Sequence, residues 1–171
     1  MREMSHIIET AEIDTDGRQV DFTVDESERQ ALMTRLDLLD LRNFTVAADI
    51  RRDVDSPAIL VQGRFRANVT QKCVVTLDPV ETAIDEGFEV RYLPMADWEE
   101  HLRRDVEVSP DDEDVEPMTG SAIDLGATVA EYLALAIDPY PRRPDVEFRF
   151  DNDVEADPGP FSALAKLRNK V

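Results

Sequence analysis

The sequence contains little of what catalytic and covalent chemistry usually requires. Its 171 residues include one cysteine, Cys73, and two histidines, His6 and His101. A single cysteine excludes an internal disulfide and a cysteine-rich zinc site. The chain has six glycines in all, which is few for the glycine-rich loops that bind phosphate. No P-loop, dinucleotide-binding turn or nucleophile elbow occurs. We therefore expect a protein that is not an enzyme, with no catalytic residues and no cofactor.

Long apolar runs and positive charge are scarce as well. No stretch approaches the roughly 20 apolar residues that cross a membrane, and the N-terminus has no signal-peptide core, so a cytoplasmic location is expected. The chain has 38 acidic and 19 basic residues, a net charge of −19. Such a chain repels nucleic acid and anionic membranes on average, and contact with either requires a local basic patch. A basic partner such as a ribosomal protein suits this charge; no membrane or DNA partner is expected.

The N-terminal part predicts a β-hairpin and a helix. Over residues 7–24, apolar and polar side chains alternate on both sides of Asp16-Gly17, which is a strong turn signal. Asp25 is a candidate N-cap, with Glu28 three residues later as in a capping box. We expect this helix to end near Leu38.

The strongest pattern lies in residues 41–93, where three segments alternate with period two. This alternation is typical of strands with one face in the core and one in water. Short polar breaks between the segments favour an antiparallel meander. The apolar positions are Phe44, Val46, Ala48 and Ile50, then Ile59, Val61, Phe65, Ala67, Val69 and Cys73, then Val80, Ile84, Phe88, Val90 and Tyr92.

The rest of the chain completes an α+β prediction. Residues 94–120 are strongly acidic and predict a mobile loop, and residues 123–137 predict a helix capped by Asp124. We expect one α+β domain over residues 1–150, with a twisted antiparallel sheet or half-barrel of about five to six strands and two packed helices. We expect residues 151–171 to be a C-terminal tail with a short amphipathic helix near 160–168.

Basic residues on one face of the middle strand are candidates for contact with RNA or a partner. Arg64, Arg66 and Lys72 lie opposite the apolar positions, and cations on one strand face suit phosphate. The alternative, which the acidic composition favours, is cross-strand pairing with neighbouring acids, or edge protection. Two further basic spots are candidates of the same kind: Arg142 with Arg143, and Lys166 with Arg168 beside the apolar face of the predicted C-terminal helix.

Other clusters favour structural explanations. Glu12, Asp14 and Asp16 resemble the start of a calcium loop, but Thr23 stands where a bidentate Glu is needed. The acids around His101 in the predicted loop are typical of solvated charge, so no metal site is expected. Cys73 shares the parity of the core positions, which predicts a buried structural thiol.

Three blocks of the sequence resemble the YceD family of large ribosomal RNA subunit accumulation proteins. The first is Gly63-Arg64-Phe65-Arg66-Ala67-Asn68-Val69-Thr70-Gln71-Lys72-Cys73, continuing to Val80. The second is Ile123-Asp124-Leu125 with Ala136-Ile137-Asp138-Pro139-Tyr140-Pro141, and the third is Pro160-Phe161 with Leu164-Ala165-Lys166-Leu167. Many family members carry a Cys-x-x-Cys pair in the first block; here Cys73 matches the first cysteine and Thr76 stands at the second.

The resemblance implies a bacterial ribosome biogenesis factor that supports synthesis, processing or stability of the large-subunit (23S) ribosomal RNA by binding. Its partners would be the large-subunit RNA precursor, a basic ribosomal protein, or both. The alternative is an acidic, chaperone-like binder of a ribosomal protein with no direct RNA contact. A metal-dependent hydrolase is a third class, but it needs paired acids on rigid elements.

Overall fold

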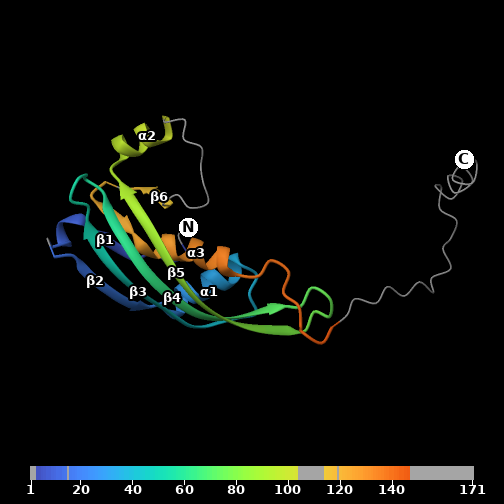
Figure 1. Ribbon diagram of the computed structural model, residues 1–171. Helices are drawn as coiled ribbons and strands as arrows, with labels where there is room; N and C mark the ends of the chain where they lie inside the picture. The colour runs from blue at the N-terminus through green and yellow to red at the C-terminus, as the bar shows by residue number, and fades with distance from the viewer. Residues whose placement is uncertain (1–2, 15, 104–113, 119, 147–171) are drawn as a thin grey trace, which may run out of the picture.

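A five-stranded sheet forms the centre of the protein (Figure 1). The computed structural model describes residues 3–14, 16–103, 114–118 and 120–146. Neighbouring strands pair antiparallel, except that β6 runs parallel to β5. The order across the sheet is β2 (Arg18–Thr23), β3 (Asp40–Arg52), β4 (Ile59–Lys72), β5 (Pro79–Leu93) and β6 (Asp114–Pro117). The sheet is open and does not close into a barrel, which confirms the α+β prediction.

The alternation along β3, β4 and β5 places one set of side chains in the core. The predicted core positions of β3 and β4 are all buried, and on β5 the positions from Ile84 to Tyr92 are buried as well. Val80, which lies near the turn between β4 and β5, is only partly buried. Near the start of β3 the register shifts between Arg42 and Thr45. Asn43 adopts a φ of 54° there, a conformation that asparagine tolerates better than most residues.

Two helices cover the apolar face of the sheet. In α1 (Glu26–Arg35), Asp25 and Glu28 form the predicted capping box, and the helix ends slightly before the expected Leu38. In α3 (Leu125–Ala136), the Asp124 side chain accepts a hydrogen bond from the Ala127 N–H, as predicted. Leu125, Val129 and Leu133 of α3 are completely buried. Both helices therefore begin where a carboxylate satisfies free backbone N–H groups.

The hairpin predicted for residues 7–24 is wrong. The first strand, β1 (Ile7–Glu9), pairs with β7 (Ala122–Asp124) in a separate two-stranded sheet, and β2 pairs with β3. A 3₁₀ turn, Thr10–Glu12, follows β1. The predicted turn does form, because Gly17 has a φ of 89° and its N–H donates to the Asp14 carbonyl. The turn redirects the chain without joining two paired strands, since three-residue β1 finds its partner 115 positions downstream.

Part of the predicted acidic loop has regular structure. Helix α2 (Met95–Arg103) follows β5 directly, and β6 adds the parallel edge strand. In α2 the Trp98 ring stacks on His101 with centroids 5.8 Å apart. The C-terminal helix expected near 160–168 lies outside the described residues. Within the described part of the chain, no helix has the length and apolarity needed to cross a membrane.

Two glycines that face opposite sides of the sheet give a test of this packing. A Cβ on Gly63 would lie 2.5 Å from Cζ of Phe88 and 2.8 Å from the Ala47 carbonyl oxygen, whereas a Cβ on Gly87 would meet only one atom, 3.7 Å away. Gly63→Ala should lower the free energy of unfolding by about 1–3 kcal/mol through overpacking. Gly87→Ala is the matched control and should raise it by about 0.5–1 kcal/mol. Urea unfolding of both variants measures the difference; equal effects would contradict this packing.

Candidate nucleic-acid interface

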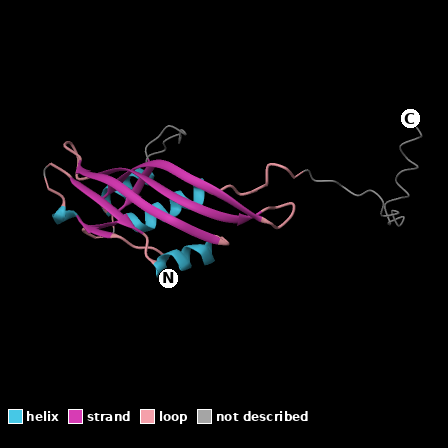
Figure 2. Ribbon diagram, turned by 90° about the horizontal axis from the view of Figure 1, so that it is seen from below, coloured by secondary structure: helices cyan, strands magenta, loops and turns pink. Residues whose placement is uncertain are grey.

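Among the residues that the structure describes, no segment covers the face of the sheet opposite α1 and α3. We call it the open face; it consists of the exposed, alternate residues of β2 to β5 that point away from the core. Figure 2 looks onto this side, with helices behind the strands. Most antiparallel sheets with one solvated face carry polar side chains there, and this one does too. Small residues interrupt the polar ones, so the face is hollowed rather than flat.

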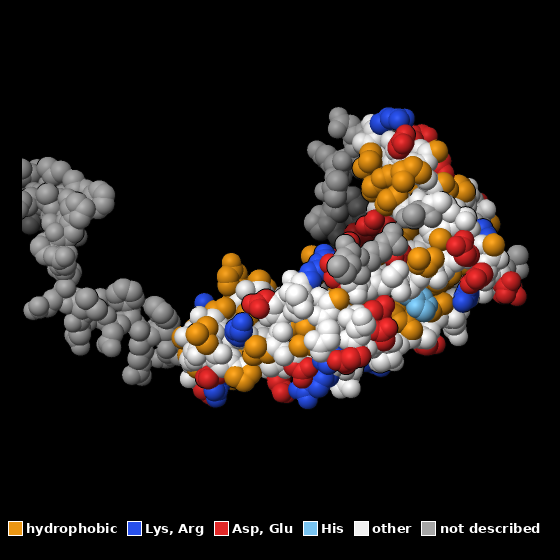
Figure 3. Space-filling model, turned by 180° about the vertical axis from the view of Figure 1, so that it is seen from behind, with side chains coloured by type: hydrophobic (Ala, Val, Ile, Leu, Met, Phe, Trp, Pro, Cys, Tyr) orange, Lys and Arg blue, Asp and Glu red, His pale blue; other side chains and the backbone are white. Residues whose placement is uncertain are grey.

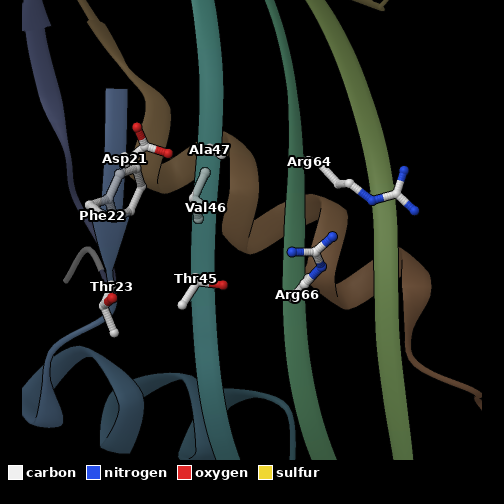
Figure 4. Close-up of a pocket in the computed structure, with 8 residues that line it drawn as sticks. All are labelled: Asp21, Phe22, Thr23, Thr45, Val46, Ala47, Arg64 and Arg66. Carbon is white, nitrogen blue, oxygen red and sulfur yellow. The ribbon is translucent and has the colours of Figure 1, made fainter. Parts of the chain in front are cut away.

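The strand register determines what lies at the centre of the open face. Thr45, Arg66 and Asp85 are aligned across three strands, and Ala47, Arg64 and Gly87 form the next row. Beside the arginines lies a hollow of about 560 Å³ (Figure 4). It is lined by Asp21, Phe22, Thr23, Thr45, Val46, Ala47, Arg64 and Arg66.

Two arginines share a single carboxylate at this centre. The Nε–H of Arg64 donates to Oδ1 of Asp85, and the Nε of Arg66 lies 3.2 Å from Oδ2 of the same residue. The hydrogen bond from Arg64 is the main reason that the pKa of Asp85 is lowered. The side chains of Arg64 and Arg66 nevertheless stay 55% and 67% exposed. Two guanidinium groups thus share one directly paired carboxylate, while Glu86 interacts with Arg64 through its charge.

Acidic residues border the arginine pair. Asp21, Asp49 and Glu89 are exposed on the same face, and Asp49 accepts a hydrogen bond from the Gln19 amide at 2.9 Å. The open face is therefore a small cationic centre inside an acidic rim, and not a continuous basic patch. A ligand that binds here must match both charges.

The other predicted contact residues lie elsewhere. Lys72 occupies the same face at the far end of β4, where its Nζ is 3.6 Å from Asp37. Arg143 pairs with Asp78 at 3.2 Å, beside the turn that follows Lys72. Arg142 is exposed, and Lys166 and Arg168 lie outside the described residues. The structure thus brings Arg64 and Arg66 together and places Lys72, Arg142 and Arg143 toward a second location.

Cys73 is completely buried, as its parity predicted, and four hydrogen bonds hold its sulfur. The Thr76 hydroxyl, the backbone N–H of Arg143 and the backbone N–H groups of Thr76 and Val75 all contact the sulfur, and together they lower the pKa of Cys73 to about 6. The sequence resemblance singled out Cys73 and Thr76, and the structure adds the contact of Cys73 with the Arg143 backbone. That contact joins segments 70 positions apart.

Acidic groups elsewhere in the described residues do not form a metal site. In the described part of the chain, no three His, Cys, Asp or Glu side chains lie close enough to hold a metal ion. Glu99 of α2 instead pairs with Arg103 one turn later.

Comparison with known proteins identifies the family. The family model described as large ribosomal RNA subunit accumulation protein YceD matches residues 61–168, more than half of the chain. The chain belongs to the YceD family. The YceD match begins in β4 and includes the arginine pair, Cys73 and the residues that follow α3. Its description connects this protein with accumulation of the large-subunit ribosomal RNA. Neither a curated protein nor a solved structure matches the chain.

The Cys73 environment predicts a pH-dependent contribution to stability. With a native pKa of about 6 and an unfolded pKa near about 8.5, folding releases a proton between these values. Stability should therefore rise with pH across this window and the contribution should be lost as pH falls through about 6. The measurement is urea unfolding of wild type and Cys73→Ala from pH 6 to pH 9. The difference between the two proteins should grow with pH; a constant difference would contradict a native thiolate.

Proposed function

We propose that this YceD protein supports accumulation of the large-subunit (23S) ribosomal RNA in the cytoplasm by binding RNA, without catalysing a reaction on it. The proposed contact is the open face, with Arg64 and Arg66 on phosphate groups and Lys72 further along the same strand. Membership of the YceD family supports the connection with this RNA. The single structural observation that carries the binding site is the exposed arginine pair on one carboxylate.

The arginine pair suits phosphate because its present partner is weakly held. Exposed ion pairs contribute only about 0–1 kcal/mol, so exchanging Asp85 for a phosphate costs little. A guanidinium group offers paired N–H donors that match phosphate oxygens. Two such groups lie side by side on β4, and Figure 4 shows Arg64 extending toward β5. A single phosphate can therefore contact both.

The hollow beside the pair offers room for the rest of a nucleotide. Its floor contains Thr45 and Ala47, and Gly87 lies next to Arg64 across the strand pair. Short side chains let a sugar or base approach the sheet while the arginine planes lie beside it, an arrangement that proteins use for unpaired RNA. The acidic rim opposes contacts that do not place a phosphate on the pair. We propose that this rim, together with the net charge of −19, limits non-specific RNA binding.

A second candidate is an acidic binder of a basic ribosomal protein. The observation that favours it is the rim itself, because Asp21 lines the central hollow and Asp49 lines the adjacent one. In this alternative the rim contacts Lys and Arg side chains of the partner, and the net charge steers the encounter. Asp85 and its two arginines would then remain paired.

Opposite charge changes in the arginine cluster test the proposal. Arg64→Glu/Arg66→Glu should weaken binding to large-subunit RNA fragments about tenfold or more, because each arginine that contacts phosphate contributes to affinity and to its salt dependence. Asp85→Asn should strengthen binding several-fold, since it removes the competing carboxylate. Dissociation constants measured by filter binding at several salt concentrations give both effects.

The control is Arg35→Glu/Arg103→Glu, which changes the net charge equally on α1 and α2, where both arginines are paired at exposed sites. If both double variants weaken RNA binding equally, the loss comes from the change in net charge, which would contradict a site on the open face. If Asp21→Asn/Asp49→Asn abolishes capture of basic ribosomal proteins while RNA affinity is unchanged in every arginine variant, the second candidate replaces the first.

A further inference from the structure

The far end of the sheet is built as a rigid projection. Strands β4 and β5 extend past the helices, and residues 138–143 lie beside the turn that joins them (Figure 1). Three bonds fix this segment: Val74 N–H to the Pro141 carbonyl at 2.9 Å, Gln71 Nε2 to the Asp138 carbonyl at 2.9 Å, and Arg143 to Asp78 at 3.2 Å. We call this end the distal tip, defined by Val74, Leu77, Tyr140, Arg142 and Arg143.

The distal tip presents an aromatic ring to solvent. Tyr140 is 70% exposed, and it is the only Phe, Tyr or Trp in the described parts of the chain whose side chain is mostly exposed. Its N–H donates to Oδ1 of Asp138 at 2.8 Å, and it lies between Pro139 and Pro141, which restrict the backbone. The ring is thus held outward by a stiff segment, although burial would be favourable for a ring of this size.

The turn of the distal tip contains a second unfavourable feature, a leucine with a positive φ. Leu77 has a φ of 65° and is 73% exposed, and its N–H closes the turn by donating to the Cys73 carbonyl at 2.9 Å. Glycine or asparagine would adopt this conformation at lower cost. Val74 in the same turn is 45% exposed. Neither side chain contributes to the core. Unfavourable backbone conformations and exposed apolar side chains are often found at functional sites.

Three basic side chains lie near these apolar groups, and two of them are paired with carboxylates. Arg142 follows Tyr140 by two residues, is exposed, and forms no ion pair with the residues that the structure describes. Arg143 is about half exposed in its pair with Asp78, and Lys72 is similarly exposed. In Figure 3 this end of the sheet carries hydrophobic, basic and acidic side chains close together. An exposed aromatic ring among cations is how proteins bind single-stranded nucleic acid, with a base on the ring and phosphates on the cations.

We propose that the distal tip binds an unpaired nucleotide of the RNA, with its base stacked on Tyr140 and an adjacent phosphate on Arg142. Leu77 and Val74 provide the apolar surface beside the base. This inference rests on the proposed function and names the RNA class, a single-stranded segment. Lys72 lies on the same face as Arg64 and eight residues further along β4, about 26 Å at strand spacing. Lys72 directly precedes Cys73, which contacts the Arg143 backbone, so Lys72 stands between the arginine pair and the distal tip.

The test compares a short unstructured RNA oligonucleotide with a duplex of the same sequence, using the full chain. Wild type should prefer the single strand, and Tyr140→Ala should weaken single-strand binding about tenfold, the loss expected for one stacked base. Tyr140→Phe keeps the ring and should bind almost as wild type. Arg142→Ala should weaken binding independently.

A fluorescence measurement checks the stacking directly. Tyr140→Trp in a Trp98→Phe background should lose fluorescence when the oligonucleotide stacks on the new ring. Because Tyr140 is mostly exposed, Tyr140→Ala should unfold at the wild-type urea concentration.

Each other outcome is distinct. If wild type binds neither RNA, the proposed function and this inference both fall. If Arg64→Glu/Arg66→Glu weakens binding but Tyr140→Ala and Arg142→Ala do not, the open face binds RNA and the distal tip does not. If Tyr140→Ala removes the protein from large-subunit precursor particles in gradient sedimentation while its oligonucleotide affinity is unchanged, the distal tip binds a protein, and the RNA assignment is overturned.

Discussion

The strict alternation of side chains in β3, β4 and β5 is the constraint on which the rest of the structure depends. One set of residues is buried under α1 and α3, and that burial supplies most of the stabilising apolar contact. The other set then has to lie on the opposite face, with no freedom to change sides, because a shift of one residue would reverse every side chain. The positions of Arg64, Arg66 and Lys72 thus follow from the core residues between them. A surface for binding is created by the same pattern that folds the chain.

Side chains from distant segments complete this arrangement. Asp124 begins α3 and also accepts hydrogen bonds from the His6 N–H at 3.0 Å and the Ser5 hydroxyl at 2.9 Å. Gly126 permits the close approach, since a Cβ there would lie 2.5 Å from the His6 nitrogen. The N-terminal segment is therefore attached to α3 beneath the sheet. The described N-terminal residues therefore do not cover the open face.

The sequence was sufficient for elements that are determined locally. Period-two patterns identified β3, β4 and β5, and the capping residues Asp25 and Asp124 identified both packed helices, because each signal lies within a few residues of its effect. The pairing of the short strands β1 and β6 was not predicted, since these strands acquire their partners only through tertiary contact. Helix α2 was hidden by its acidic composition, although Met95, Trp98 and Leu102 have helical spacing. Among the site residues, parity placed Arg64 and Arg66 on one face, but their shared Asp85 depends on the register between strands. The contact of the segment around Arg143 with Cys73 has no local signal at all.

The pairing of β1 with β7 has a consequence for the order in which the protein folds. The three long strands and α1 are complete in sequence by Leu93, and their contacts are mostly between neighbours along the chain, which favours early formation. β1 cannot find its partner until residues 122–124 have left the ribosome. During synthesis the N-terminal segment therefore remains unpaired while the meander forms, and the apolar face of the sheet stays partly uncovered until α3 follows. Closure of the core is the last step, and it requires both ends of the domain at once.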